Sequence, residues 1–129
     1  MLVVDTSAVL AALVAEEPNA ALVERLGADG DLHAPHLIDV ELVHALRRLV
    51  HRGELAGDRA QAARADFGDL PIVRYPHVAL VDRMWELRDN VTAYDAAFVA
   101  LSEALGVPLV TTDARLASAP GHKAEVERF

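Results

Sequence analysis

The sequence predicts an α/β fold with a central, mainly parallel sheet flanked by helices. Short apolar segments alternate with helical periods along the chain, which is typical of strand–helix–strand units with right-handed crossovers. The continuous apolar run Val107–Val110 is typical of a strand that is buried on both faces. At 129 residues, the chain is expected to form a single domain, residues 1–129, with a substantial core.

The N-terminal segment predicts a strand that ends at an acid. Met1–Val4 is apolar and is followed by Asp5. Thr6 and Ser7 are then expected to cap a helix over Ala8–Val14. An acid in this position would lie at the carboxyl edge of a parallel sheet, where ligands bind in such folds.

A second helix and a second strand are expected next. After Asn19, an amphipathic helix should run over Ala20–Leu26. Gly27 and Gly30 are expected to close this helix because glycine accepts the left-handed conformation that ends helices. A short strand around Leu32–Ala34 follows.

The next predicted helix, His36–Arg52, carries the second candidate acid, Glu41. Its apolar stripe passes through Ile38, Leu42, Ala45, Leu46 and Leu49. Glu41 lies roughly 80° from the centre of this stripe, so its side chain can reach past the core into a cleft. The remaining face carries Val40, Val43 and Val50. We therefore expect a second covered surface on this helix, made by a neighbouring helix or by a subunit.

The middle of the chain is expected to add a polar helix at Ala56–Phe67, a strand at Pro71–Arg74 and a helix at His77–Arg88. Helical spacing in the last of these predicts that Val78, Val81 and Trp85 turn inward, together with Leu87 or Leu80. Trp85 is thus expected in the core and not as a platform for stacking a base.

The C-terminal part begins with a helix that has clear boundaries. Thr92 is a suitable N-cap, which places Asp95 in or just before the first turn. Phe98, Leu101 and Leu105 then recur at helical spacing until Gly106.

The fourth candidate acid follows this helix and the strand after it. The strand Val107–Val110 leads to Asp113, which again stands at the carboxyl end of an apolar strand. A short helix at Ala114–Ala117 and a last strand within Ala124–Phe129 are expected beyond it.

Composition excludes several classes of protein. The chain has no cysteine, which excludes disulfides and thiolate metal sites and fits a reducing, cytoplasmic location. No apolar run approaches the length of a membrane span, and no basic leader begins the chain, so neither a membrane location nor a signal peptide is expected. The net charge of -8 argues against a simple electrostatic nucleic-acid binder, but it allows a nuclease whose acids are neutralised by metal.

Four acids form the candidate site: Asp5, Glu41, Asp95 and Asp113. Mg²⁺ and Mn²⁺ prefer oxygen ligands, so carboxylates from separate segments suit such cations. Without a cation, two like charges about 4 Å apart repel by roughly 4 kcal/mol at an effective dielectric near 20, and raised pKa values are expected. With a cation, a bound water becomes a better nucleophile towards a phosphodiester.

Three of these acids also have purely structural explanations. Asp95 could be an ordinary helix-start residue, Glu41 a solvated charge and Asp113 a cap for the short helix after it. For Asp5 a functional role is favoured over a structural one, because this residue ends an apolar N-terminal strand. Other acids stand in polar surroundings and are expected to be solvated: Glu16, Glu17, Asp29, Asp31, Asp39, Glu54, Asp58 and Glu125.

Three stretches in the same order resemble the PIN domain, and specifically the VapC-type toxins of bacterial type II toxin–antitoxin pairs. These stretches are M-L-V-V-D-T-S-A at the start, L-x-x-V-E-L around Glu41, and T-A-Y-D-A-A-F-V-A-L-S-E-A-L-G-V-P-L-V-T-T-D-A-R-L-A near the end. The resemblance covers nearly the whole chain, and the last stretch is its most specific part.

This resemblance implies a PIN-like fold and Mg²⁺- or Mn²⁺-dependent endoribonuclease activity on RNA. It implies that Asp5, Glu41, Asp95 and Asp113 are metal ligands or organisers of the attacking water. The hydroxyl residues Thr6, Ser7 and Thr112 would be hydrogen-bond partners beside those acids. The family also implies a homodimer that a small antitoxin protein holds inactive. Many relatives carry a further acid soon after the fourth, whereas Ala114, Arg115, Leu116 and Ala117 follow Asp113 here, so a second metal would be weakly held or arrive with substrate.

Some features keep more than one interpretation. Arg47, Arg48, His51 and Arg52 form a basic patch that the helix dipole explains, with RNA contact as a second use. A non-catalytic PIN-like binding module is an alternative function, although it would predict the loss of an acid. A receiver or phosphatase domain is less favoured because such sites usually need a lysine, and the only lysine, Lys123, lies in the tail.

Overall fold

Five parallel strands form the centre of the computed structural model, which describes residues 1–28 and 30–129. The strands are β1 (Leu2–Val4), β2 (Leu32–Pro35), β3 (Ile72–Tyr75), β4 (Leu109–Thr111) and β5 (Val126–Arg128). They are ordered β3-β2-β1-β4-β5, and every neighbouring pair is parallel. The predicted α/β class with a parallel sheet is therefore confirmed. Asp29, expected above to be solvated, lies outside the described residues.

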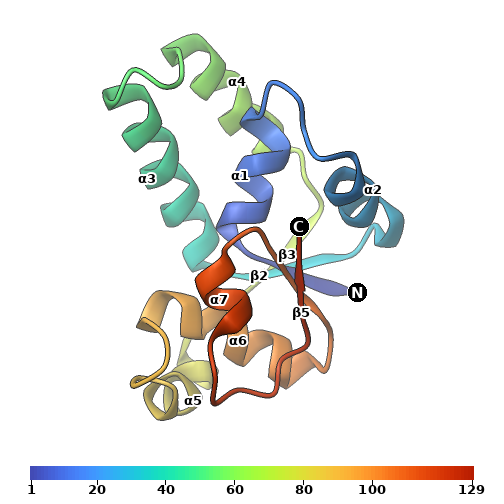
Figure 1. Ribbon diagram of the computed structural model, residues 1–129, viewed down its shortest axis with the longest axis vertical. Coiled ribbons are helices and arrows are strands. Elements are labelled where there is room, and N and C mark those ends of the chain that lie inside the picture. Colours follow the sequence, from blue (N-terminus) through green and yellow to red (C-terminus); the bar gives the residue numbers. More distant parts are fainter.

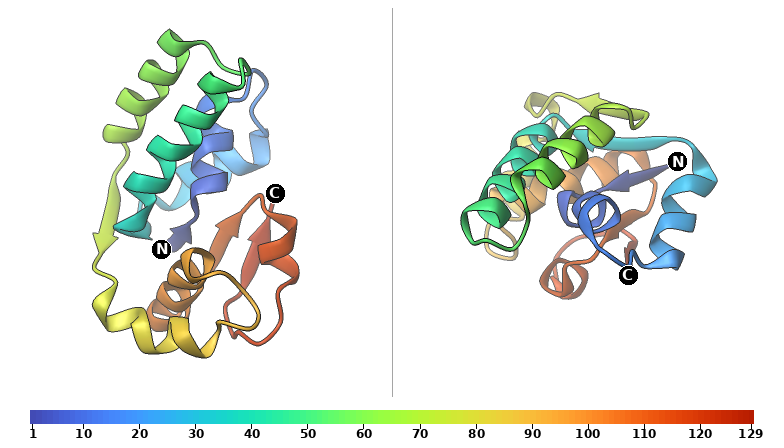
Figure 2. Two further views of the ribbon diagram at one scale, coloured as in Figure 1. Left: turned by 90° about the vertical axis from the view of Figure 1, so that its left-hand side faces the viewer. Right: turned by 90° about the horizontal axis from the view of Figure 1, so that it is seen from above.

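The helical elements are α1 (Thr6–Val14), α2 (Ala20–Asp29), α3 (Leu37–His51), α4 (Gly57–Gly68), η1 (Val78–Leu80), α5 (Val81–Glu86), α6 (Ala93–Leu105) and α7 (Ala114–Ser118). In Figure 1, α1 and α3 lie on one side of the sheet with α4 packed against both, and α5 and α6 lie on the other side. The views in Figure 2 show the same two helical layers. In the part of the chain that the structure describes, no helix is both long enough and apolar enough to cross a membrane.

The order of the strands creates a switch point between β1 and β4. From β1 the chain moves outward to β2 and β3, and it then returns through α5 and α6 to place β4 on the opposite side of β1. The connections after β1 and after β4 therefore leave the carboxyl edge of the sheet in opposite directions. In open α/β sheets, a crevice for ligands forms at such a point.

The start of α1 and the end of α2 differ from the prediction. Asp5 itself caps α1, because its side chain accepts a hydrogen bond from the backbone N–H of Ala8, and Thr6 and Ser7 are the first helical residues. The helix α2 continues through Gly27 and is closed by Gly30 alone, whose φ of 58° is in the left-handed region. The prediction that Gly27 closes this helix was wrong because a single interior glycine costs only about 1 kcal/mol.

The segment predicted as one helix over His77–Arg88 is instead the 3₁₀ turn η1 followed by the short helix α5. A 3₁₀ turn rotates about 120° per residue instead of 100°, so the α-helical period used for the prediction does not apply here. Val78, Val81 and Trp85 are consequently exposed, whereas Leu80 and Leu87 are buried. The predicted inward position of Trp85 was therefore wrong. Its ring lies 4.5 Å below the guanidinium carbon of Arg88.

The core is continuous between the sheet and α6. All residues of β1 and β4 are buried, and seven consecutive residues of α6, Ala96–Ser102, are buried against the sheet and α5. Small alanine side chains let this helix lie close to the strands, while Phe98 fills the space beside them. This packing fixes the N-terminus of α6, and hence Asp95, relative to β1.

The contrasting burial of two aromatic residues predicts a contrast in stability. Phe98→Ala should lower the free energy of unfolding by about 3–5 kcal/mol, because it opens a cavity in the core. Trp85→Ala should lower it by less than about 1 kcal/mol, because only an exposed cation–π contact is lost. Urea unfolding of both variants and the wild type measures these values. Similar losses in the two variants would contradict the described packing.

Candidate active site

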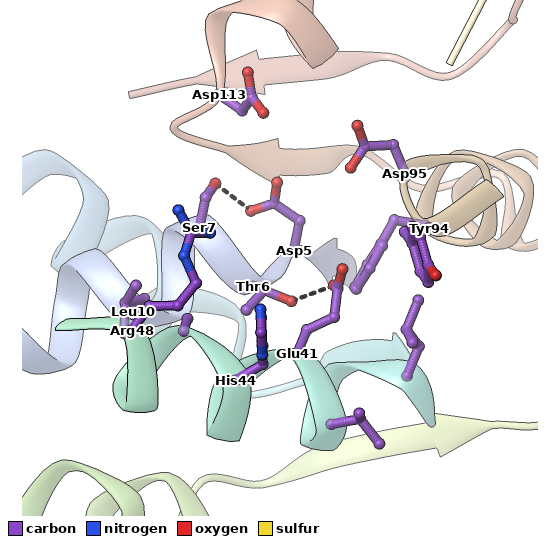
Figure 3. A pocket seen from close by; sticks show the side chains of 14 residues that line it. Asp5, Thr6, Ser7, Leu10, Glu41, His44, Arg48, Tyr94, Asp95 and Asp113 are labelled. Atoms are coloured by element: carbon purple, nitrogen blue, oxygen red, sulfur yellow. Dashed lines mark hydrogen bonds between the residues drawn. The ribbon is translucent and has the colours of Figure 1, made fainter. Parts of the chain in front are cut away.

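The four acids predicted from the sequence line one cavity of about 660 Å³. We call this cavity the acidic cleft and define it by Asp5, Glu41, Asp95 and Asp113. Figure 3 shows their side chains arranged around a shared space, although they come from the end of β1, from α3, from α6 and from the residue before α7. The cleft lies at the switch point between β1 and β4, at the carboxyl edge of the sheet.

Asp5 is the best-anchored acid of the cleft. One of its oxygens, Oδ1, accepts hydrogen bonds from the Ser7 hydroxyl at 2.7 Å and from the Ala8 backbone N–H at 2.9 Å. The other, Oδ2, accepts a hydrogen bond of 2.5 Å from the Thr111 hydroxyl. This last contact follows from the strand register, because Val4 pairs with Val110 and the next residues of the two strands therefore face each other. A buried carboxylate needs such partners, and Asp5 is only 5% exposed.

Glu41 reaches the cleft from the second turn of α3. Its Oε1 accepts a hydrogen bond of 2.7 Å from the Thr6 hydroxyl at the start of α1. Its neighbour Leu42 is fully buried, so the helix is held by its apolar stripe while Glu41 emerges at the edge of that stripe. This is the position that the helical angle predicted.

Asp95 and Asp113 enter from the opposite wall, and both lie at helix starts. Asp95 is in the first turn of α6, where its backbone N–H donates to the hydroxyl of the N-cap Thr92. Asp113 is the N-cap of α7 and accepts hydrogen bonds from the backbone N–H groups of Arg115 and Leu116. The structural explanations for these acids are therefore correct, yet both side chains also line the cleft.

Burial and mutual repulsion make the cleft electrostatically unfavourable. Burial raises the pKa of Asp5, and the charge of Asp95 raises it further, against the lowering effect of its hydrogen bonds from Thr111, Ala8 and Ser7. Burial likewise raises the pKa of Glu41, with added repulsion from Asp95 and Asp5. Burial and the charge of Asp113 raise the pKa of Asp95. For each of these three acids burial is the largest cause and repulsion from a neighbouring acid adds to it, in the direction expected for acids held together without a cation.

The predicted hydroxyl partners are placed as follows. Thr6 bonds to Glu41 and Ser7 bonds to Asp5. For Thr112, only the backbone N–H takes part, donating to the Ser7 hydroxyl at 3.0 Å. Among the described residues, the threonine whose hydroxyl bonds to a cleft acid from β4 is Thr111 instead.

Thr111 is the residue of the candidate site that was not predicted from the sequence. Its hydroxyl donates to Asp5 and accepts a hydrogen bond from the backbone N–H of Asp113, so it connects two acids of the cleft. The expected strand ended at Val110, and this left Thr111 in the loop. Recognising that the strand continues by one residue would have placed its side chain opposite Asp5.

The donor set fits a hydrated divalent cation. Within residues 1–28 and 30–129, no group of three acidic, histidine or cysteine side chains forms a ready-made metal centre. Mg²⁺ commonly keeps several waters and is held by only one or two carboxylates together with substrate phosphates, so it does not need such a group. Carboxylate oxygens that face one cleft and repel one another suit this mode of binding.

The basic patch predicted at the end of α3 is divided between two surfaces. Arg48 lines the acidic cleft, as does His44 one turn before it. Arg47 and His51 line a separate groove of about 310 Å³ between α3 and α4, and Arg52 follows the helix end. The helix α4 thus covers part of the second face of α3, while Val40 and Val43 stay exposed.

Fold and site together define a class of protein. The family model described as the PIN domain matches residues 2–121. The chain therefore belongs to the PIN domain family.

The relatives narrow the class further. Ribonuclease VapC1 of Mycobacterium tuberculosis is 45% identical over 126 residues, which cover 97% of this chain and 95% of that protein. Within the PIN domain family, the chain is thus of the VapC type.

Solved structures support the fold. The crystal structure of PAE2754 from Pyrobaculum aerophilum has a TM-score of 0.72 at 22% identity and covers 97% of this chain and 81% of that chain. The structure of Mycobacterium tuberculosis VapC20, described as a sarcin-ricin loop cleaving toxin, has a TM-score of 0.66 at 19% identity. The match covers 92% of this chain and 94% of that chain. Both comparisons concern the fold, which is the predicted PIN-like architecture.

Removing one charge from the cleft should stabilise the metal-free protein at neutral pH. The pKa of Asp95 is raised from its ordinary value of 3.8, so the native state binds a proton more tightly than the unfolded state does. Stability contributed by this group is therefore lost as the pH rises through the raised native pKa. Asp95→Asn should raise the melting temperature in EDTA by a few degrees at neutral pH, and this gain should disappear at pH values below 3.8.

Thermal unfolding across this pH range measures the effect. Asp89→Asn, which removes an exposed acid outside the cleft, is the control and should change little. A metal-free Asp95→Asn protein that melts below the wild type at neutral pH would contradict the repulsion described for the cleft.

Proposed function

We propose that this protein is a Mg²⁺- or Mn²⁺-dependent endoribonuclease that acts as the toxin of a toxin–antitoxin pair. The observation that carries this proposal is the convergence of four carboxylates on one cleft at the switch point of the sheet, in a chain of the VapC type. The curated relative is named a ribonuclease, and its similarity covers nearly the whole of both chains. A metal-dependent nuclease also explains why repelling acids are kept together.

The roles of the residues follow from their contacts. Asp5 is held by three hydrogen bonds and would be a rigid ligand for the cation. Glu41 has one side-chain bond, from Thr6, and keeps an oxygen available for a ligand or for the attacking water. Asp95 and Asp113 would hold the cation or its waters from the opposite wall. The bound cation would supply a more acidic water and would stabilise charge on the phosphodiester oxygens.

The chemistry requires one water and one phosphodiester bond. The oxygen of the water forms a bond to phosphorus, and the bond from phosphorus to one ribose oxygen breaks. The carboxylates of the cleft would orient this water and take up its proton. The leaving ribose oxygen then receives a proton, so that hydrolysis is balanced.

The family membership also supports proposals about partners and location. A small antitoxin protein would restrain the activity, and the protein would act as a homodimer in the cytoplasm, without a membrane. The exposed apolar residues Val40 and Val43 on α3, and Val81 and Trp85 on α5, favour at least one covered surface. One PIN domain spanning residues 1–129 is part of the same proposal.

The structure gives less support to a receiver or phosphatase domain. The backbone N–H of Lys123 donates to Glu103, and Lys123 does not line the acidic cleft. A lysine beside the acids, which such a phosphoryl site usually needs, is therefore not supplied by this residue. A non-catalytic binding module remains the alternative that the following experiment separates from an enzyme.

Purified protein without an antitoxin should cleave RNA from a pool of structured RNAs when Mg²⁺ or Mn²⁺ is added. EDTA should abolish the discrete products. Asp95→Asn should reduce the rate of cleavage by at least about 100-fold, because the substitution removes a carboxylate from the cleft but keeps the shape of the side chain. Gel analysis of the labelled pool measures this rate.

The exposed-acid variant Asp89→Asn should cleave at the wild-type rate and controls for contaminating nucleases. Cleavage that persists at full rate in folded Asp95→Asn would remove Asp95 from the site. A folded wild type that produces no cleavage with either metal would favour the binding module.

A further inference from the structure

Two residues of the acidic cleft are not acids and have chemistry suited to a nucleic acid. Arg48 comes from α3 and Tyr94 comes from the first turn of α6, and both line the cavity. Figure 3 shows Arg48 at one end of the cavity beside Ser7 and Tyr94 at the other end beside Asp95, with the carboxylates between them. The roles assigned above to the four acids use neither residue.

Arg48 belongs to the same face of α3 as Glu41. His44 follows Glu41 by three residues and Arg48 follows His44 by four, a spacing that places all three on one side of a helix. The Arg48 side chain is exposed and makes no ion pair or side-chain hydrogen bond among the described residues. By contrast, Arg74 and Arg83 each hold a carboxylate through two hydrogen bonds. The guanidinium of Arg48 is therefore available for a ligand.

Tyr94 offers an aromatic surface next to the acids. Tyr94 is 62% exposed, although Ala96–Ser102 of the same helix are buried. Within the described residues, neither its ring nor its hydroxyl has a partner. The helix start fixes the backbone of Tyr94, since the preceding N-cap Thr92 is bonded to the N–H of Asp95. An exposed ring on a fixed backbone is suited to stacking on a base.

From these positions we infer that the cleft binds an unpaired segment of RNA, with Arg48 holding a phosphate and Tyr94 stacking on a base of the same strand. This inference rests on the proposed function, because the scissile phosphodiester would lie between the two residues, at the acids. A cleft with four carboxylates repels a polyanion, so a free guanidinium on its wall supplies attraction that the acids cannot. A base can stack on Tyr94 only when it leaves its own helix, which selects single strands and loops over duplexes.

Binding of a short single-stranded RNA, measured without cleavage, tests this inference. The probe is a fluorescein-labelled oligoribonucleotide of mixed sequence, and Ca²⁺ replaces Mg²⁺ as an oxygen-preferring cation while a gel confirms that the RNA stays intact. Fluorescence anisotropy over a range of salt concentrations gives the affinity and its salt dependence. A second probe carries 2-aminopurine, whose fluorescence is quenched when the base stacks.

Each residue has its own expected signature. Arg48→Gln should weaken binding several-fold and reduce the slope of log affinity against log salt by about 0.7, the value for one phosphate of a single strand. Tyr94→Ala should weaken binding about 10-fold and abolish the 2-aminopurine quenching, without changing the salt slope. Arg48→Lys should keep the slope, and Tyr94→Phe should keep the quenching.

Matched controls come from the same helical layers. Arg47→Gln removes the same charge from the adjacent position of α3, but Arg47 lines the groove against α4 and not the cleft. Trp85→Ala removes an exposed aromatic ring that lies outside the cleft. Both variants should bind the probes as the wild type does. The wild type should bind a fully paired duplex of the same sequence more weakly than the single strand. Tyr94→Ala should reduce this difference in affinity between single strand and duplex.

The outcomes separate this inference from the proposed function. A wild type that cleaves RNA, with Arg48→Gln and Tyr94→Ala variants that bind both probes normally, would overturn the inference and leave the enzyme intact. An equal loss of RNA affinity in the control variants would also overturn the inference. The effect would then come from the total charge or the number of exposed aromatic rings, and not from Arg48 and Tyr94. A folded wild type that neither binds nor cleaves RNA would overturn both.

Discussion

The hydrogen bond between Asp5 and Thr111 is the contact on which the site depends most. It joins the ends of β1 and β4, the two central strands whose connections diverge at the switch point. Because the same Thr111 hydroxyl accepts from the backbone N–H of Asp113, the strand register also sets where the fourth acid stands. The fully buried strands leave this register little freedom, since a shift by one residue would turn every side chain to the other face.

Holding the four acids in one cleft lowers the stability of the protein, but it provides the carboxylates that the proposed reaction needs. Burial raises the pKa of Asp5, Glu41 and Asp95, and repulsion among the acids adds to this effect. The core of α6 and the hydroxyls of Thr6 and Thr111 keep the acids close despite that repulsion. The proposed cation would offset this repulsion, because it brings positive charge between the carboxylates.

The sequence predicted the class of fold and all four acids of the cleft because these depend on local patterns. Apolar runs followed by acids identified β1 and β4, and the helical angle placed Glu41 at the edge of the stripe on α3. The strand order and the role of Thr111 depend on pairing between distant segments, which no single segment reveals. The interior position predicted for Trp85 failed because a 3₁₀ turn changed the rotation per residue. The division of the basic patch between two surfaces could not be predicted either, because it depends on how α4 packs against α3.

The measurement that tests the account most directly is calorimetric titration of Mn²⁺ into the metal-free wild type and into Glu41→Gln. Glu54→Gln, which neutralises an exposed acid just beyond α3, is the matched control. If the cleft is the cation site, the wild type and the control bind Mn²⁺ alike, and Glu41→Gln binds it about 10-fold or more weakly. Equal affinity in all three proteins, or no binding to the folded wild type, would contradict the claim that these carboxylates are brought together to hold a cation.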